Sequence, residues 1–170
     1  QEVLRNLLSL PEECSRTACV ALEDRIMSLC PEGVERIYPY IARLLALPVD
    51  AMTAARLDNL VEAGLLQSAI SRAVADLVAC GVRQTPLVLV LEDTHWADVA
   101  SLALLEYLLA LTDHVPLLLI VVMRPVRTHG CWRIREAVIR DYDHRHTDLQ
   151  LEPLSAKENE ALVRRLLKSG

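Results

Sequence analysis

Two adjacent carboxylates, Glu92 and Asp93, follow directly after an unbroken apolar run, Leu87–Leu91. A strand that is buried on both faces has continuous apolar residues, and ligands of open α/β sheets collect where the strands end. Carboxylate oxygens suit the hard Mg²⁺ ion, which keeps several of its waters. One acid can therefore hold a hydrated Mg²⁺ while its neighbour orients or deprotonates an attacking water. A strand that merely ends in solvated acids is the simpler alternative.

The guanidinium of Arg124 follows the next apolar run, residues 116–122. A guanidinium at the end of a buried strand could contact a terminal phosphate and report its presence. The alternative is a surface arginine at the sheet edge. Between the acids and this arginine lie His95 and Trp96, and we expect Trp96 to pack against the helix that follows it.

The second half of the chain alternates between strand and helix patterns. We predict two buried parallel strands, 87–91 and 116–122, separated by a helix with Asp98 as its N-cap. A short helix near 132–140 precedes a third strand around Leu149 and Leu151, and a capping box at 155–158 begins the last helix. These elements predict an α/β fold with a mainly parallel sheet.

The first half has helical periodicity. We predict helices over 16–29, with Val20 and Leu22 on the apolar face, over 34–47, and over about 53–80, with Gly81 just beyond the last. We divide the chain into a helical region, 1–85, an α/β core, 86–152, and the start of a further helical module, 153–170. The helical segment thus precedes the sheet.

Composition restricts the function classes. The apolar fraction of 52% indicates a globular domain, and a net charge of −5 argues against direct contact with nucleic acid. No apolar run reaches the roughly 18 residues of a membrane span. The five cysteines lack a metal-binding or disulfide pattern, so we expect reduced thiols in a cytoplasmic protein; they are Cys14, Cys19, Cys30, Cys80 and Cys131.

The strings PLVLVLEDTHWAD, LEDTHWADVASLALLEYL and LEPLSAKENEALVRRLL resemble the AAA-like ATPase module of the signal-transduction (STAND) P-loop NTPases. Such modules occur in bacterial LuxR-type regulators and in multidomain adenylate or guanylate cyclases. The resemblance implies a partial P-loop NTPase fold with three layers and a mainly parallel sheet. It also implies a Walker B strand, with Glu92 at the Mg²⁺-binding acid and Asp93 at the water-handling position, although these roles could be exchanged. It further implies that Arg124 is a sensor arginine, that ATP and Mg²⁺ are the cofactors, and that an output domain is attached. His95 receives no settled role from it.

No G-x-x-x-x-G-K-[ST] loop occurs in the sequence, so the usual phosphate cradle is absent. We expect that these 170 residues are a segment of a longer protein that starts after that loop, and that the segment alone does not hydrolyse ATP. In this class the strand of the missing loop pairs with the sensor strand, so residues 117–122 would have an unpaired edge and could self-associate. Two functions remain open: part of an ATP-driven regulatory switch, and a degenerate NTPase scaffold that only binds proteins.

Overall fold

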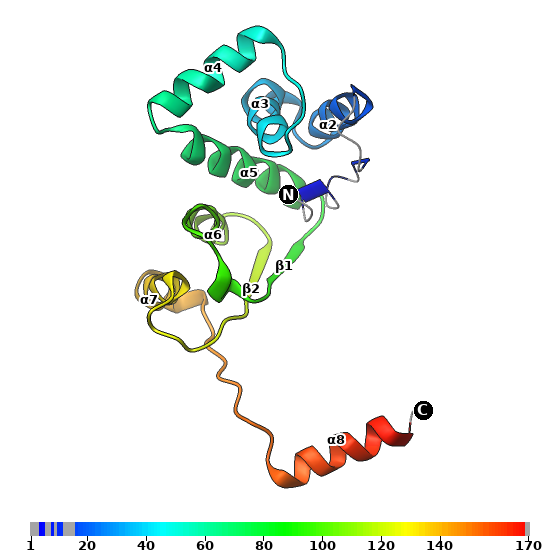
Figure 1. Cartoon of the computed structure of the whole chain (residues 1–170), viewed down its shortest axis with the longest axis vertical. Coiled ribbons are helices and arrows are strands. Elements are labelled where there is room, and N and C mark those ends of the chain that lie inside the picture. Colours follow the sequence, from blue (N-terminus) through cyan, green and yellow to red (C-terminus); the bar gives the residue numbers. More distant parts are fainter. Residues whose placement is uncertain (1–3, 6–7, 9, 12–15, 169–170) are drawn as a thin grey trace. The chain divides into compact units, whose positions relative to one another are not determined.

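The computed structural model describes residues 4–5, 8, 10–11 and 16–168 (Figure 1). The chain forms two compact units, residues 1–136 and 137–170. The first unit contains helices α2 to α6, both strands and the beginning of α7. The second contains the end of α7 (Gly130–Asp141), the short η3 turn (Asp143–Arg145) and α8 (Ala156–Lys168).

The first unit begins with the predicted helices. Helix α2 (Arg16–Leu29) has the predicted bounds, and the 3-10 turn η1 (Pro31–Gly33) follows it. Ala18 is buried and Val20 is exposed, so one position of the predicted apolar face was wrong. Helix α3 (Val34–Leu44) ends three residues earlier than predicted. Gly33 lets the backbone of η1 pass close to the Cys30 side chain, because a Cβ at this position would lie 2.6 Å from the Cys30 Sγ atom.

The predicted long helix over 53–80 is two helices, α4 (Ala51–Glu62) and α5 (Leu66–Val82). Gly64 lies between them with φ +67°, a left-handed conformation that glycine adopts without steric cost. The sequence prediction was wrong because it extended one helix across this glycine. Gly81 does not follow the helix either, since α5 continues to Val82.

Helix α5 is buried on two sides. Ala73, Val74 and Leu77 belong to a cluster with α2 and α3. Ala75, Val78 and Val82 belong to a second cluster, which also holds Leu108 of α6 and Leu117 of the sheet. Figure 1 shows α5 between the other N-terminal helices and the sheet region. Both cores of the first unit therefore share this helix.

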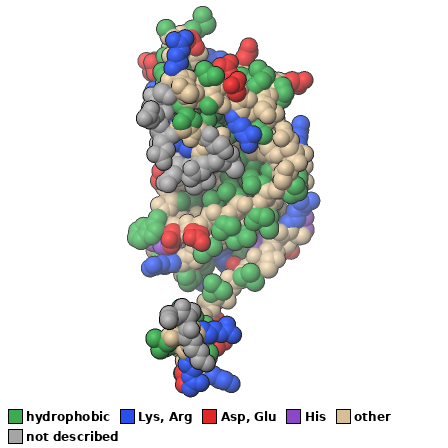
Figure 2. Space-filling model, turned by 90° about the vertical axis from the view of Figure 1, so that its right-hand side faces the viewer, with side chains coloured by type: hydrophobic (Ala, Val, Ile, Leu, Met, Phe, Trp, Pro, Cys, Tyr) green, Lys and Arg blue, Asp and Glu red, His purple; other side chains and the backbone are tan. Residues whose placement is uncertain are grey.

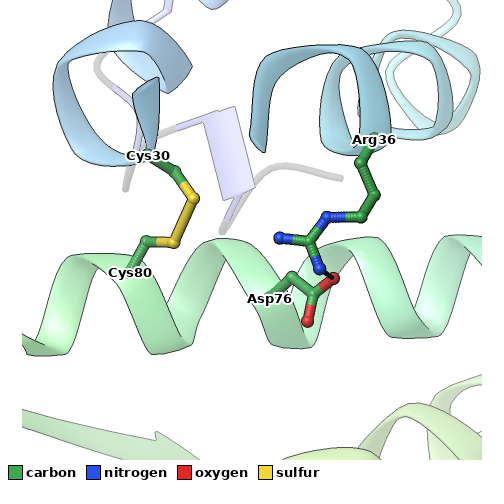
Figure 3. Close-up of polar contacts among 4 residues, drawn as sticks. All are labelled: Cys30, Arg36, Asp76 and Cys80. Carbon is green, nitrogen blue, oxygen red and sulfur yellow. Dashed lines mark hydrogen bonds and ion pairs between the residues drawn. A yellow bond between two sulfur atoms is a disulfide. The ribbon is translucent and has the colours of Figure 1, made fainter. Parts of the chain in front are cut away.

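A disulfide joins Cys30, at the end of α2, to Cys80 in the last turn of α5 (Figure 3). One turn earlier on α5, Asp76 forms an ion pair with Arg36 of α3, with 2.8 Å between the guanidinium nitrogen and the carboxylate oxygen. The prediction of reduced thiols was wrong for this pair, because helix packing brings together two cysteines that are 50 residues apart. Cys19 and Cys131 are free thiols, and Cys14 lies outside the described residues.

The sheet contains β1 (Leu87–Leu91) and β2 (Leu117–Val121), connected by α6 (Val99–Leu111). The two strands are parallel as predicted, with Leu87 opposite Leu117 and Leu91 opposite Val121. Leu87, Leu89 and Leu119 pack against the second core cluster. This β-α-β unit is a small α/β fold within a chain that is mostly helical.

The other face of the sheet is exposed, which corrects the prediction of strands buried on both faces. Val88 and Val90 of β1 are 57% and 49% exposed, and Leu118 and Ile120 of β2 are 55% and 42% exposed. Figure 2 shows hydrophobic side chains across the side of the molecule on which the strands lie. Continuous apolar strands are used when both faces are covered, so these residues have no cover from the described part of the chain.

The predicted third strand around Leu149 and Leu151 does not form. Both residues lie in irregular structure and are 81% and 89% exposed. The capping box of α8 is confirmed: the Ser155 amide donates to Glu158 Oε2 at 2.8 Å, and the Glu158 amide donates to Ser155 Oγ at 3.4 Å. The short alternation of two leucines was therefore too weak a strand signal.

In the described part of the chain, no single helix is long and apolar enough to cross a membrane. Helices α4 and α5 meet the length and composition test only as a pair, and they are bent by 119° at their junction.

The disulfide should stabilise the first unit by closing a long loop. A chain-entropy estimate for a 50-residue separation gives about 4 kcal/mol. We predict that Cys30→Ser/Cys80→Ser loses an amount of this order in urea unfolding followed by circular dichroism. Cys19→Ser is the control, and it should unfold close to the wild type. Equal stability of the double variant and this control would contradict the prediction.

Candidate functional site

The acids Glu92 and Asp93 lie in a loop that is held at the carboxyl end of β1. Both are exposed, and the Asp93 side chain is 76% exposed. Hydrogen bonds connect this loop to the end of β2: the Val122 amide donates to the Leu91 carbonyl at 2.8 Å, and the Thr94 amide donates to the Val122 carbonyl at 3.0 Å. The two strand ends are therefore fixed side by side.

The backbone of Asp93 is left-handed, with φ 50° and ψ 32°. Aspartate tolerates this conformation better than most residues do. The 3-10 turn η2 (Thr94–Trp96) follows, and the Thr94 hydroxyl donates to the Leu91 carbonyl at 3.0 Å. After this sharp reversal the Asp93 carboxylate is exposed, whereas the next two residues, Thr94 and His95, are buried.

Asp98 ends the loop as the predicted N-cap of α6. Its carboxylate accepts a 2.7 Å hydrogen bond from the Ser101 amide. Hydrogen bonds from Ser101, the backbone one first, lower the pKa of Asp98 below its usual value. The cap fixes where α6 starts, so it sets the length of the loop that carries the acids.

Behind the acids lies a cluster of three rings. The His95 side chain is only 2% exposed, and its Nδ1 is 3.8 Å from Asp93 Oδ1. The His129 ring stacks on His95 with centroids 5.8 Å apart and planes 16° apart. Trp96 is 76% exposed, so the prediction that it packs against the following helix was wrong. Sequence reasoning missed His129, since nothing in its neighbours marks it.

Arg124 follows β2 by three positions and is exposed. Because the carboxyl ends of parallel strands meet at one sheet edge, Arg124 and the acid loop lie at the same edge. Val122 is 44% exposed and brings no side-chain donor to this edge. The three predicted site residues are thus on neighbouring strand ends, with two charges of one sign and one of the other.

The donors fit a magnesium ion that is shared with a ligand. Mg²⁺ is usually held by one or two carboxylates together with substrate phosphates and waters. Glu92 and Asp93 supply two exposed carboxylates of this kind. Among the described residues, no group of three or more His, Cys, Asp or Glu side chains could hold a metal. A fully protein-made cage is therefore not present there.

The left-handed backbone of Asp93 should restrict which residues the loop accepts. We predict that Asp93→Asn unfolds like the wild type, since asparagine tolerates this conformation, whereas Asp93→Val loses about 1–2 kcal/mol of stability. Urea unfolding of the two variants measures the difference. Valine and asparagine variants of equal stability would show that the strain is absent.

Comparison with known proteins adds an independent finding. The AAA ATPase domain family model matches residues 2–121, which is more than half of the chain and includes the helical region, β1, the acid loop and β2. No curated protein and no solved structure matches the chain. The parallel β1–α6–β2 unit fits part of the P-loop NTPase fold that this family has. The chain therefore belongs to the AAA ATPase domain family.

Proposed function

We propose that the chain is the Mg²⁺-binding and phosphate-sensing part of an ATP-dependent regulatory switch. One observation carries the proposal: two exposed acids and an arginine follow neighbouring parallel strands in a chain of the AAA ATPase domain family. The G-x-x-x-x-G-K-[ST] loop is absent from the 170 residues, so the proposal requires that residues outside them supply it.

Each residue has a distinct part in this proposal. Glu92 contributes carboxylate oxygens to the ion, and Asp93 orients the attacking water and accepts its proton. Bound Mg²⁺ would neutralise charge on the β- and γ-phosphates. Arg124 donates to the γ-phosphate and so distinguishes ATP from ADP. The backbone hydrogen bonds between the strand ends keep the acids and the arginine-bearing segment at one edge.

We further propose that the switch belongs to a signal-transduction protein. The support is the sequence resemblance to the ATPase modules of LuxR-type transcriptional regulators and of adenylate or guanylate cyclases. ATP and an attached output domain are then the partners, and the output domain would be a cyclase, a helix-turn-helix domain or helical repeats. Any nucleic-acid contact would belong to that domain, because the net charge here is −5.

Val122 favours the second candidate, a non-catalytic scaffold. In the STAND-type modules that the sequence resembles, a small hydroxyl residue usually occupies this position, whereas valine cannot donate a hydrogen bond to phosphate. A chain that has lost turnover would keep its fold and bind proteins through its exposed apolar surface. Hydrolysis measurements on the natural polypeptide that carries these residues separate the two candidates.

Asp93→Asn tests the catalytic proposal. In the natural polypeptide we predict that this variant binds Mg·ATP with nearly wild-type affinity, while its kcat falls about 10²- to 10⁴-fold, because the amide cannot accept the proton of water. Phosphate-release kinetics and calorimetric titration measure the two quantities.

Asp58→Asn is the matched control, since it removes an exposed carboxylate from α4, far along the chain from the acid loop. It should keep wild-type turnover. Unchanged turnover in Asp93→Asn would remove Asp93 from the mechanism. A wild type that binds no Mg·ATP would favour the scaffold.

We also propose that this chain self-associates through its sheet. In the part of the chain that is described, each strand has a partner on one side only, and Leu118 and Ile120 are exposed beside the open edge of β2. Unpaired strand edges template the addition of a further strand.

We predict concentration-dependent dimers of the 170-residue chain in sedimentation velocity, which Leu118→Lys should abolish because a charge on this face opposes association. Met52→Lys serves as the control, since Met52 is 84% exposed on α4. A monomer at every concentration tested would contradict the proposal.

A further inference from the structure

His95 is a buried polar residue that has no assigned task. Its side chain is 2% exposed, and neither ring nitrogen has a hydrogen-bond partner among the described residues. A neutral imidazole carries one N–H donor and one acceptor, and burying a donor without a partner costs free energy. A function that requires the imidazole next to the acid loop would explain why this cost is tolerated.

The Asp93 carboxylate lies near the His95 ring but not within hydrogen-bond distance of it. The Nδ1 atom lies 3.8 Å from Asp93 Oδ1, about 1 Å longer than a charge-assisted hydrogen bond. Asp93 itself is held from the backbone side, because Thr94 bonds to both Val122 and Leu91. The backbone is thus fixed, whereas the exposed carboxylate can still rotate about its side-chain bonds.

His129 lies in the segment between β2 and α7 and contacts the His95 ring from there. Its ring lies nearly parallel to that of His95, with the planes 16° apart, and this stacking limits rotation of the His95 ring. The Nδ1 of His95 is thereby kept on the side of the acid loop. His129 belongs to the segment that also carries Arg124, so the stack connects the two halves of the site.

We propose that His95 is a positioning residue: its Nδ1–H holds the Asp93 carboxylate in the orientation needed for the water, and His129 holds the His95 ring. This inference rests on the proposed function for its catalytic consequence. The hydrogen bond itself does not depend on ATP. Removing a partner that orients a site carboxylate in this way typically lowers activity by about 10- to 100-fold.

The hydrogen bond can be tested on the 170-residue chain without nucleotide. Long-range ¹⁵N–¹H correlation spectra report which ring nitrogen carries the proton. We expect a protonated Nδ1 in His95, and in Asp93→Ala we expect the proton to move to Nε2. An unprotonated Nδ1 in the wild-type chain would overturn the proposal, whether or not the natural polypeptide hydrolyses ATP.

The positioning role can be tested by comparing amide substitutions at His95 in the natural polypeptide. The amide nitrogen of asparagine occupies nearly the place of Nδ1, whereas that of glutamine lies closer to Nε2. We expect His95→Gln and His95→Ala to lower kcat about 10- to 100-fold with KM for ATP nearly unchanged. His95→Asn should restore most of the lost kcat.

His114→Asn is the control, because it makes the same change at an exposed histidine after α6, and it should behave as wild type. A merely structural role predicts that the smaller asparagine does no better than glutamine and that kcat follows thermal stability. That pattern would overturn the proposal. A wild type without ATPase activity refutes the proposed function instead, and the spectra then decide the hydrogen bond alone.

Discussion

The arrangement of the first unit depends on the burial of α5 from two sides. Leu77 faces the cluster made with α2 and α3, and the adjacent Val78 faces the cluster made with α6 and the sheet. A helix with two apolar faces must be covered on both, so its neighbours are fixed relative to one another. The disulfide at Cys80 and the ion pair at Asp76 attach this helix to α2 and α3. The strands that carry the site rest on its other side.

The proposed chemistry depends on where the strands end. Leu91 and Val121 are opposite each other, so the residues after them emerge at one edge. The Val122 amide and the Thr94 amide then continue the pairing past the strands, which leaves the acids exposed above a buried histidine. Exposure of the carboxylates and burial of the imidazole have the same origin, namely the tight turn that begins with a left-handed Asp93.

The sequence was informative where a local signal determined the structure. The apolar run before Glu92, the Asp98 cap and the Ser155 capping box all predicted elements that form. The break at Gly64 is also local, but the helical pattern on both sides of it hid the break. The sequence was uninformative where packing decided: the disulfide of Cys30 with Cys80 and the stacking of His129 on His95 join residues without a local motif. The exposed strand face and the absent strand near Leu149 show that an apolar pattern predicts a need for burial, which the described residues do not meet.

The central proposal is that the acid pair holds the magnesium ion of ATP through Glu92, with Asp93 beside it handling the attacking water. The most direct test is a calorimetric titration of ATP into the natural polypeptide, once with Mg²⁺ and once with a chelator. The wild type is compared with the Glu92→Gln/Asp93→Asn double variant. The account predicts that Mg²⁺ strengthens ATP binding by the wild type and has much less effect on the double variant. Equal dependence on Mg²⁺ in the two proteins would contradict it, because the ion would then be held without these acids.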